Sequence, residues 1–349
     1  MTVDVIEDRS AVEHRENLVR LAEERMREFL AGERAAWVDR NSKVTAPLDA
    51  VYELVAAGGK RIRPAFCVSG YLAAGGDADD TRIVDAAIAL ELLHACALIH
   101  DDVVDESAQR RGAPTAHVRY EAEHAARQWH GPSWRFGEAV AILAGDLALV
   151  YSDRFMSGIS AELDRLWAEL RAELIFGQYM DVRAAAELAT DPELSRWIAV
   201  LKSGHYTIHR PLAVGAVVAG RPDLAGAFEE YGVSVGQAFQ LRDDLIDVFG
   251  DAETTGKPAG LDLERHKMTL LMALATQRDP RVHELVTAPQ PDLAEIRTVF
   301  QEQGIRDEIE AAIGRLVEQG CDALDRAPLA PRWRDELAAM ARQVAYRDR

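Results

Sequence analysis

The sequence contains few cysteines and few of the signals of a secreted or membrane-bound protein. Its 349 residues include only Cys67, Cys96 and Cys321, which are widely spaced and form no CxxC pair. Neither a disulfide framework nor a cysteine-based zinc site is indicated, and a reducing, cytoplasmic location is expected. Residues 1–20 are rich in Asp, Glu and Arg and lack the apolar core of a signal peptide. Apolar stretches such as 143–151 are shorter than the ~20 residues that span a bilayer, so no stable membrane insertion is expected.

Positive charge is also scarce. Lys and Arg total 40 against 58 Asp and Glu, which gives a net charge of −18 at pH 7. The overall field repels polyanions, which argues against nucleic-acid binding, so local basic clusters need a separate explanation. No Pro/Gly/Ser-rich linker divides the chain. We therefore expect one domain over residues 1–349, with a motif-bearing core at about 47–277 and C-terminal helices at 285–349.

Strand patterns are nearly absent, and helical periodicity takes their place. Residues 11–37 place apolar side chains at steps of three and four among charged ones, which is typical of an amphipathic helix. The same period recurs around 47–57, 81–100, 138–159, 161–182, 193–203, 224–249, 267–277, 293–301, 305–326 and 332–345. Breaks such as Gly58-Gly59 and Gly131-Pro132 separate these segments. The pattern predicts an all-α fold of roughly ten to thirteen helices.

Two aspartate clusters interrupt this helical sequence, DDVVD at 101–105 and DDLID at 243–247. The outer aspartates of each are four residues apart, so on a helix they share one face about 6 Å apart. Like charges at this spacing destabilise a helix unless a cation binds there. Oxygen ligands without nearby cysteine suit Mg²⁺, which binds a few carboxylates together with phosphates and waters. The candidate metal ligands are Asp101, Asp102, Asp105, Asp243, Asp244 and Asp247.

A single cluster of this kind in an acidic protein would be better explained as a solvated helix end. Here, however, each cluster ends a markedly apolar segment, 86–99 before the first and 233–241 before the second. A solvated acidic face does not need such a neighbour, whereas an apolar wall could hold a hydrocarbon chain beneath a metal-bound diphosphate. The pair of clusters therefore favours metal binding.

Basic residues gather at two places. Lys60, Arg61 and Arg63 follow Gly58-Gly59 near the start of a helix, which suits anion binding, although a solvated basic turn is the alternative. Two arginines at 110–111 come shortly after the first aspartate cluster, close enough to neutralise a diphosphate held by the same metals. Further isolated cations, each of which alone would be assigned to the surface, are Lys202, Lys257 and Lys267.

Seven segments together carry a family resemblance. They read GGKRIRP (58–64), LLHACALIHDDVVDES (92–107), RRG (110–112), GQYMD (177–181), KSGHYT (202–207), FQLRDDLID (239–247) and TGKPAGLDLERHKMTL (255–270). In this order they resemble the motifs of the isoprenyl diphosphate synthase family, and within it the bacterial geranylgeranyl diphosphate synthases. The resemblance implies the type I isoprenoid synthase fold, a large helical bundle with a central apolar cavity, and activity as a transferase.

The resemblance also implies roles for individual residues. The two aspartate clusters would hold the allylic diphosphate through Mg²⁺. The diphosphate of isopentenyl diphosphate would be bound by Lys60, Arg63, His94 and Arg111. The allylic diphosphate would be contacted by Arg110, Lys202, Lys257 and Lys267, with Lys202 counted among the catalytic residues. Positions that line the cleft would be Gln178, Asp181, Ser203 and Gln240. His266 departs from the family pattern, because many relatives have glycine directly before the lysine at this position.

The reaction implied is ionisation, condensation and elimination. Metals and cations stabilise the departing diphosphate, the alkene of isopentenyl diphosphate attacks the allylic cation, and proton loss restores a double bond. Product length in this family depends on side chains before the first aspartates, which here are Leu93, Cys96 and Ala97. Cys96 lies ~7.5 Å before Asp101 along a helix, and neither it nor Ala97 has the bulk of an aromatic plug. A C20 product, geranylgeranyl diphosphate, is therefore expected, with a longer one possible and a farnesyl-length stop less favoured.

Two other functions are compatible with part of this pattern, a class I terpene cyclase and a non-catalytic synthase subunit. A class I terpene cyclase shares the first aspartate cluster, but it usually replaces the second one with an Asn/Ser/Glu motif and lacks the GGKRIRP segment. A non-catalytic synthase subunit would be expected to lose catalytic aspartates, whereas all six are present. The family resemblance further implies a homodimer. The apolar helices before and after the first cluster are one candidate interface, which the sequence alone does not locate.

Overall fold

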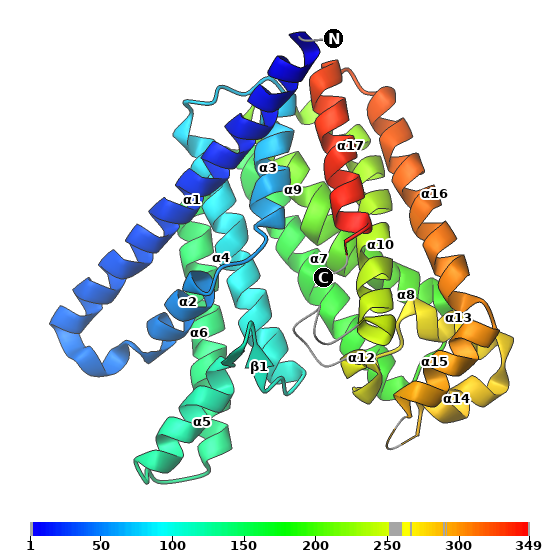
Figure 1. The fold of residues 1–349 in the computed structure, drawn as a ribbon. Helices are drawn as coiled ribbons and strands as arrows, with labels where there is room; N and C mark the ends of the chain where they lie inside the picture. Colours follow the sequence, from blue (N-terminus) through cyan, green and yellow to red (C-terminus); the bar gives the residue numbers. More distant parts are fainter. Residues whose placement is uncertain (1–2, 251–259, 266, 289, 291, 348–349) are drawn as a thin grey trace. The chain divides into compact units, whose positions relative to one another are not determined.

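The computed structural model describes residues 3–250, 260–265, 267–288, 290 and 292–347. These residues are almost entirely helical (Figure 1), and their only strands form one short antiparallel hairpin, β1 (Gln109–Arg110) and β2 (Ala113–Pro114). The predicted all-α class is confirmed, although the described part of the chain contains sixteen α-helices, more than the sequence predicted. The chain divides into two compact units. The N-terminal unit comprises residues 13–68 and 77–164, and the C-terminal unit comprises the remainder. Each is described by itself.

Six helices contribute to the N-terminal unit. They are α1 (Val3–Asn41), α2 (Ala46–Ala56), α3 (Ile62–Ala73), α4 (Thr81–Val104), α5 (Ala116–Ala126) and α6 (Ser133–Met156), with a 3₁₀ turn, η1 (Ser42–Val44), after α1. On α1, Leu18, Ala22, Met26 and Leu30 are all buried, and their four-residue spacing is that of one helix face. Helices α4 and α6 form the main packed pair of this unit. Their close approach depends on Gly145, where an added Cβ would collide with the ring of His100.

Helix α4 passes through the middle of the N-terminal core. By length and composition, a window of 18 residues in this helix could cross a membrane. The apolar stretches expected from the sequence did not include this window. However, 72% of the window is buried inside the protein, as in the core helix of a folded domain. Its apolar character is thus explained by packing against its neighbours.

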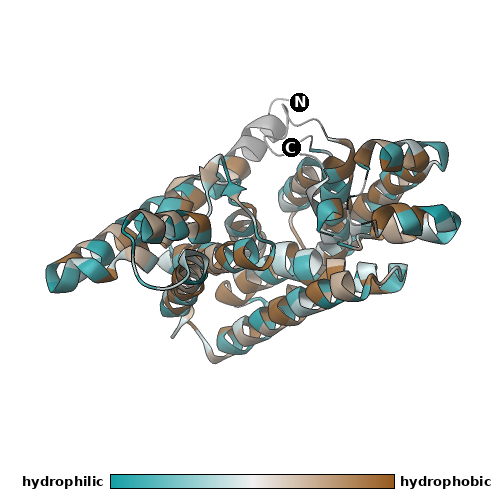
Figure 2. Ribbon diagram, turned by 90° about the horizontal axis from the view of Figure 1, so that it is seen from below, coloured by the Kyte–Doolittle hydropathy of each residue, from teal (hydrophilic) through white to brown (hydrophobic). Residues whose placement is uncertain are grey.

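The C-terminal unit is built around α10 (Ala225–Phe249). Before it come α7 (Ala161–Glu187), α8 (Pro192–Ala199), the π-helix η2 (Val200–His209), α9 (Arg210–Val218) and the 3₁₀ turn η3 (Pro222–Leu224). After it come α12 (Leu261–Glu264), α13 (Leu270–Arg278), α14 (Pro280–Val286), α15 (Leu293–Glu302), α16 (Ile305–Asp325) and α17 (Pro331–Ala345). Helix α10 packs against α16 on one side and against η2 on another. Figure 2 shows hydrophobic and hydrophilic segments alternating along individual helices, as expected for amphipathic elements.

Two glycines of α10 bring it into backbone contact with η2. A Cβ added to Gly232 would overlap the backbone of His209, and one added to Gly236 would overlap the Cα of Gly204. The two helices therefore approach more closely than side chains at these positions would allow. This contact fixes the π-helix, which carries Lys202 and Ser203, against the helix that carries the second aspartate cluster.

Candidate active site

The first aspartate cluster lies at the C-terminal end of α4. Asp101 is in the last turn, and Asp105 caps the helix by donating its backbone N–H to the carbonyl of Asp101 at 2.8 Å. Both side chains are half-buried. The outer aspartates are therefore one turn apart, as predicted. The chain then leaves the helix at Glu106, which has a φ of +50°.

The middle aspartate of this cluster is turned inward. Asp102 is only 4% exposed, and both of its carboxylate oxygens accept from Nε of Arg110, at 2.8 and 3.0 Å. An Nη atom of the same arginine lies 2.7 Å from Oδ1. Burial raises the pKa of Asp102 above its ordinary value, and the hydrogen bonds from Arg110 oppose that rise. The geometry thus joins Asp102 and Arg110 into one buried ion pair.

The Gly58-Gly59 turn and the hairpin arginines meet in the N-terminal unit. Arg111 donates to the carbonyl of Leu54 at 3.0 Å and to that of Gly58. Gly59 makes room for it, because an added Cβ would lie 2.8 Å from a guanidinium nitrogen of Arg111. The structure therefore brings Arg111 of the RRG motif to the turn of the GGKRIRP motif, which carries Lys60 and Arg63.

The second basic residue of the turn has a structural role. Arg61 is 8% exposed, with a φ of +48°, and it forms ion pairs with Glu91 on α4 and with Glu23 on α1. It also donates to the carbonyl of Val55 at 3.0 Å. Arg61 thus anchors the turn to two helices, while Lys60 beside it is exposed.

His94 lies on α4 within the field of these arginines. Burial and then the charges of Arg63, Arg111 and the neighbouring arginines lower the pKa of His94 well below its usual range. The imidazole is therefore neutral near pH 7 and can donate one hydrogen bond without adding to the local charge. An environment that disfavours a cation this strongly favours an anion.

The candidate chain-length residues occupy different faces of α4. Leu93 and Cys96 are buried and Ala97 is half-buried. The thiol of Cys96 lies 3.8 Å from Nδ1 of His100. The Nε2 atom of the same histidine is hydrogen-bonded to the carbonyl of Ile142 on α6, at 3.0 Å. Cys96 therefore faces α6. Ala97 is one turn before Asp101 and shares its face, with Leu93 one turn further back.

The second aspartate cluster lies near the C-terminal end of α10 and repeats the pattern of the first. Asp244 is only 2% exposed and accepts a hydrogen bond from Gln240 at 2.9 Å. Burial raises the pKa of Asp244 well above its ordinary value, opposed by this hydrogen bond and increased by nearby carboxylates. Ser203 donates to Oε1 of Gln240 at 2.6 Å, which continues the chain of hydrogen bonds from α10 to η2.

The outer aspartates of this cluster have other partners. Asp243 is half-buried and forms an ion pair with Arg347, whose guanidinium lies 4.0 Å from the centre of the Phe239 ring. One oxygen of Asp247 accepts the backbone N–H of Asp262 at 3.2 Å. These contacts tie the end of α10 to the segments that follow it in the chain.

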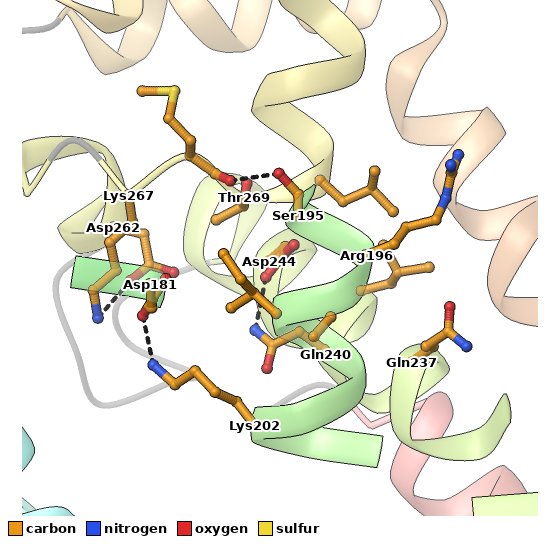
Figure 3. Close-up of a pocket in the computed structure, with 15 residues that line it drawn as sticks. Asp181, Ser195, Arg196, Lys202, Gln237, Gln240, Asp244, Asp262, Lys267 and Thr269 are labelled. Carbon is orange, nitrogen blue, oxygen red and sulfur yellow. Dashed lines mark hydrogen bonds and ion pairs between the residues drawn. The ribbon is translucent and has the colours of Figure 1, made fainter. Parts of the chain in front are cut away.

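A cavity of about 130 Å³ lies beside Asp244 in the C-terminal unit (Figure 3). Lys202 from η2 reaches into it and lies 2.5 Å from Asp181 of α7. Lys267 lies 3.9 Å from Asp262. Gln240 and Ser195 also border the cavity, and Ser195 donates to the carbonyl of Met268 at 2.9 Å. The cavity is thus lined by cations and carboxylates drawn from several helices.

Several predicted site residues do not line this cavity or lie outside the described residues. Gln178 is half-buried on α7 and is not among the residues that line the cavity. Lys257 and His266 lie outside the described residues. The two aspartate clusters belong to different units, so their predicted position on opposite walls of one site stays a prediction.

The sequence analysis did not single out Asp262, Arg347 or the Arg61–Glu91 pair. Asp262 stands within the TGKPAGLDLERHKMTL segment, so its position five residues before Lys267 was the available signal. Arg347 pairs with Asp243 across 104 residues of sequence, and Arg61 pairs with Glu91 across 30. Such separations leave no local pattern.

Both aspartate clusters lie at helix C-termini, where carboxylates are unfavourable. The macrodipole places roughly half a negative charge at this end of each helix, and like charge there costs about 0.3–1 kcal/mol per group. Three carboxylates at the end of α4 and three at the end of α10 therefore create strongly negative positions. Hard oxygen ligands in such a field are suited to a divalent cation. The residues present fit a metal of this kind.

Comparison with known proteins identifies relatives across most of the chain. The family model described as polyprenyl synthetase matches residues 45–302. A geranylgeranyl pyrophosphate synthase from Corynebacterium glutamicum, solved with isoprenyl diphosphate and magnesium, is 38% identical. It superposes with a TM-score of 0.88 over 95% of this chain and 98% of its own. The fold is thus the all-α type I isoprenoid synthase fold, as predicted.

Curated relatives differ in the products for which they are named. A short chain isoprenyl diphosphate synthase from Methanothermobacter thermautotrophicus is 35% identical over 66% of this chain and 67% of its own. A geranylfarnesyl diphosphate synthase from Aeropyrum pernix is 32% identical over 79% of this chain and 86% of its own. The comparisons therefore support prenyl transfer without distinguishing one product length.

Proposed function

This chain belongs to the polyprenyl synthetase family and is a prenyl diphosphate synthase, and we propose that it makes geranylgeranyl diphosphate with Mg²⁺ as its metal. The substrates would be isopentenyl diphosphate and an allylic diphosphate, either dimethylallyl, geranyl or farnesyl. The observation that carries the proposal is the pair of DDxxD clusters, each at a helix C-terminus with its middle aspartate turned inward. The C. glutamicum relative binds magnesium and isoprenyl diphosphate, which supports the same ligands here.

The outer aspartates are the proposed metal ligands that face the diphosphate. They are Asp101, Asp105, Asp243 and Asp247. The inward aspartates, Asp102 and Asp244, would add charge to the same sites while holding Arg110 and Gln240 in place. When bound, Mg²⁺ supplies Lewis-acid stabilisation of the departing diphosphate.

Basic side chains would bind the remaining diphosphate oxygens. Lys60, Arg63 and Arg111, with the neutral His94 as a hydrogen-bond donor, form the proposed site for isopentenyl diphosphate, because the Gly58-Gly59 turn gathers them. Arg110 and the lysines 202, 257 and 267 would contact the allylic diphosphate and stabilise the charge that develops as its C–O bond breaks. Elimination of a proton to the released diphosphate then requires no protein nucleophile.

The end of the prenyl tail is proposed to lie along the face of α4 that carries Ala97 and Leu93. Ala97 is on the face of Asp101, so a tail that extends from a diphosphate at Asp101 would meet it first. Cys96 faces α6, bonded toward His100, and is the less direct determinant of the three. A methyl group at Ala97 leaves room for growth beyond C15, which supports the C20 product.

A product assay tests the proposal. Purified enzyme is incubated with Mg²⁺, isopentenyl diphosphate and each allylic primer, and the dephosphorylated products are separated by chromatography. A dominant C20 alcohol from each primer is expected. Accumulation of C15 alone from a shorter primer would refute the proposed product, and unchanged turnover in Asp101→Ala or Asp243→Ala would refute the assigned metal ligands. Asp39→Ala on the exposed part of α1 is the matched control.

We further propose that the enzyme is a cytoplasmic homodimer. Apolar side chains on one face of α7 are exposed, with Ile175 at 65%, Phe176 at 62% and Tyr179 at 59%. Exposed contiguous apolar groups on a helix favour association with a partner surface. All three cysteines are free thiols, which fits a reducing compartment. Light scattering of the wild-type protein and of Phe176→Asp should give a dimer and a monomer respectively.

A further inference from the structure

Three potential metal ligands converge in the C-terminal unit, away from its aspartate cluster at 243–247. His205 and His209 come from the π-helix η2, and Glu229 comes from the second turn of α10. One ligand atom from each lies within 4.8 Å of the others. The two imidazole rings meet edge to face, with their centroids 5.0 Å apart. Two histidines and one carboxylate form a ligand set that zinc and similar metals bind.

His209 contributes an unsatisfied nitrogen to this cluster. The residue is 3% exposed, and among the described residues no group lies within hydrogen-bond distance of its buried Nδ1 atom. Burial of a polar nitrogen without a partner costs about 1–3 kcal/mol. A neutral imidazole with a free electron pair is the form that coordinates metals.

His205 is oriented by a second carboxylate. Its Nδ1 atom lies 3.3 Å from Oε2 of Glu173 on α7. A proton on Nδ1 would be donated to Glu173 and would leave Nε2 as the electron-pair donor. This carboxylate–histidine arrangement is the usual outer support of a metal-bound histidine, since it fixes the tautomer and makes the ring a better donor.

The local charge also favours a cation. Three carboxylates, those of Glu169, Glu173 and Glu229, surround one guanidinium, that of Arg210. Nε of Arg210 is 2.9 Å from Glu173, so its charge is already paired. Together these four side chains carry a net charge of −2, which a divalent ion would balance.

The cluster is distinct from the second aspartate cluster. Glu229 precedes Asp244 by 15 residues on the same helix, or ~22 Å along its axis. The backbone beneath the histidines is held by the Gly232 contact, where α10 meets His209 directly. The ligands thus project from two helices that are already in register.

We infer that His205, His209 and Glu229 bind a divalent transition-metal ion of the zinc class, with water in a fourth position. Ligand atoms at 2.0–2.1 Å from such an ion would be roughly 3.3 Å apart, so the side chains close by rotation when it binds. The ion joins η2, which carries Lys202 and Ser203, to α10, which carries the second aspartate cluster. This site goes beyond the proposed prenyl transfer.

Cobalt titration of the full-length protein tests this inference. Protein freed of metal by dialysis against a chelator is kept in excess Mg²⁺, which occupies the aspartate clusters, and Co²⁺ is added. Co²⁺ bound by two histidines and a carboxylate gives visible d–d bands that Co²⁺ in water or on carboxylates alone does not match in intensity. We expect one equivalent to bind, and Zn²⁺ to displace it and bleach the bands.

Two variants test the ligands and one serves as a control. Glu229→Gln and His205→Gln should each weaken Co²⁺ binding at least tenfold, and both positions lie outside the tightly packed core. His283→Gln, at an exposed histidine of the same unit, should bind as the wild type does. Circular dichroism confirms that each variant is folded. Wild-type Co²⁺ affinity in either folded ligand variant, or the lack of a Mg²⁺-resistant band in the wild type, would overturn the inference. Product formation with Mg²⁺ is recorded separately, so a failure of the proposed function is distinguished from a failure of this site.

Discussion

Replacing Gly236 by alanine tests how closely α10 and η2 are packed. The added Cβ would overlap the Cα of Gly204 and lie 2.7 Å from its backbone nitrogen and 3.1 Å from the carbonyl carbon of Ser203. These neighbours are backbone atoms, so no side-chain rotation relieves the clash. The helices must move apart, and the hydrogen bonds from Ser203 through Gln240 to Asp244 span the same contact.

Gly226 on the same helix provides the matched control, because nothing lies within 4 Å of a Cβ built there. At this exposed position, alanine lowers the entropy of the unfolded chain and should stabilise the protein by about 0.4–1 kcal/mol. At Gly236, overpacking should destabilise it by about 1–3 kcal/mol. One and the same substitution, made twice in one helix, is thus expected to change the free energy of unfolding in opposite directions.

Equilibrium urea unfolding measures both values, and steady-state kinetics measures the consequence for the site. Gly236→Ala should lower kcat, since Lys202 and Asp244 are displaced relative to one another, whereas Gly226→Ala should leave kcat unchanged. Equal stability of the two variants would show that the contact between η2 and α10 is looser than described. A destabilised Gly236→Ala enzyme with wild-type kcat would break the link between this packing and catalysis.

Further predictions concern the N-terminal unit. Glu91→Ala removes the main partner of the buried Arg61 and should lower the free energy of unfolding by about 3–5 kcal/mol. Glu24→Ala, at an exposed ion pair, is the control and should lower it by less than about 1 kcal/mol. A small effect of Glu91→Ala would refute the anchoring role of Arg61. Because the pKa of His94 is depressed in the free protein, a bound diphosphate should raise it, so binding should take up a proton and tighten as the pH falls. Calorimetry of isopentenyl diphosphate binding in buffers of different ionisation enthalpy measures this uptake, and the same uptake in His94→Gln would contradict the assignment. Ala97→Phe should shorten the main product to C15, whereas Cys96→Phe, which faces α6, should chiefly destabilise the protein. Chromatography of the products measures the first effect, and thermal unfolding measures the second. An unshortened product from Ala97→Phe would contradict the proposed path of the tail.

Helical periodicity predicted the elements that bury one face. The segment 332–345 corresponds to α17 (Pro331–Ala345), and 305–326 corresponds to α16 (Ile305–Asp325). Helices α3 and α9 were missed because residues on nearly all of their sides are buried, so no polar stripe marks a period. The helix expected at 193–203 continues through η2 to His209. Gly204 lowers helix propensity there, yet its place is explained by the backbone contact with α10.

The site could be predicted where its geometry is local. Spacing by four residues placed Asp101 and Asp105 one turn apart, since that follows from the helix itself. The inward turn of Asp102 could not be predicted, because it depends on Arg110 from the hairpin that follows. The His205–His209–Glu229 cluster was missed for the same reason. The two histidines lie on η2 and Glu229 lies on α10, so no single segment of the sequence contains the whole ligand set.

The repeated DDxxD pattern thus gives each cluster two kinds of carboxylate, an outward-facing pair and one that points inward. At one helix end, an outward pair at positions one and five presents carboxylates on a common face, while position two, about 100° further round, points into the protein. In the first cluster the inward carboxylate holds a cation, Arg110, and in the second it holds an amide, Gln240. The charge and hydrogen bonds of Arg110 oppose the rise in the pKa of Asp102, whereas an amide does less to offset the burial of Asp244, whose pKa is raised well above its ordinary value. A divalent ion bound by Asp243 and Asp247 would supply the missing positive charge. We therefore expect the second cluster to depend on a bound metal more than the first, even though the two sequences differ only between their aspartates.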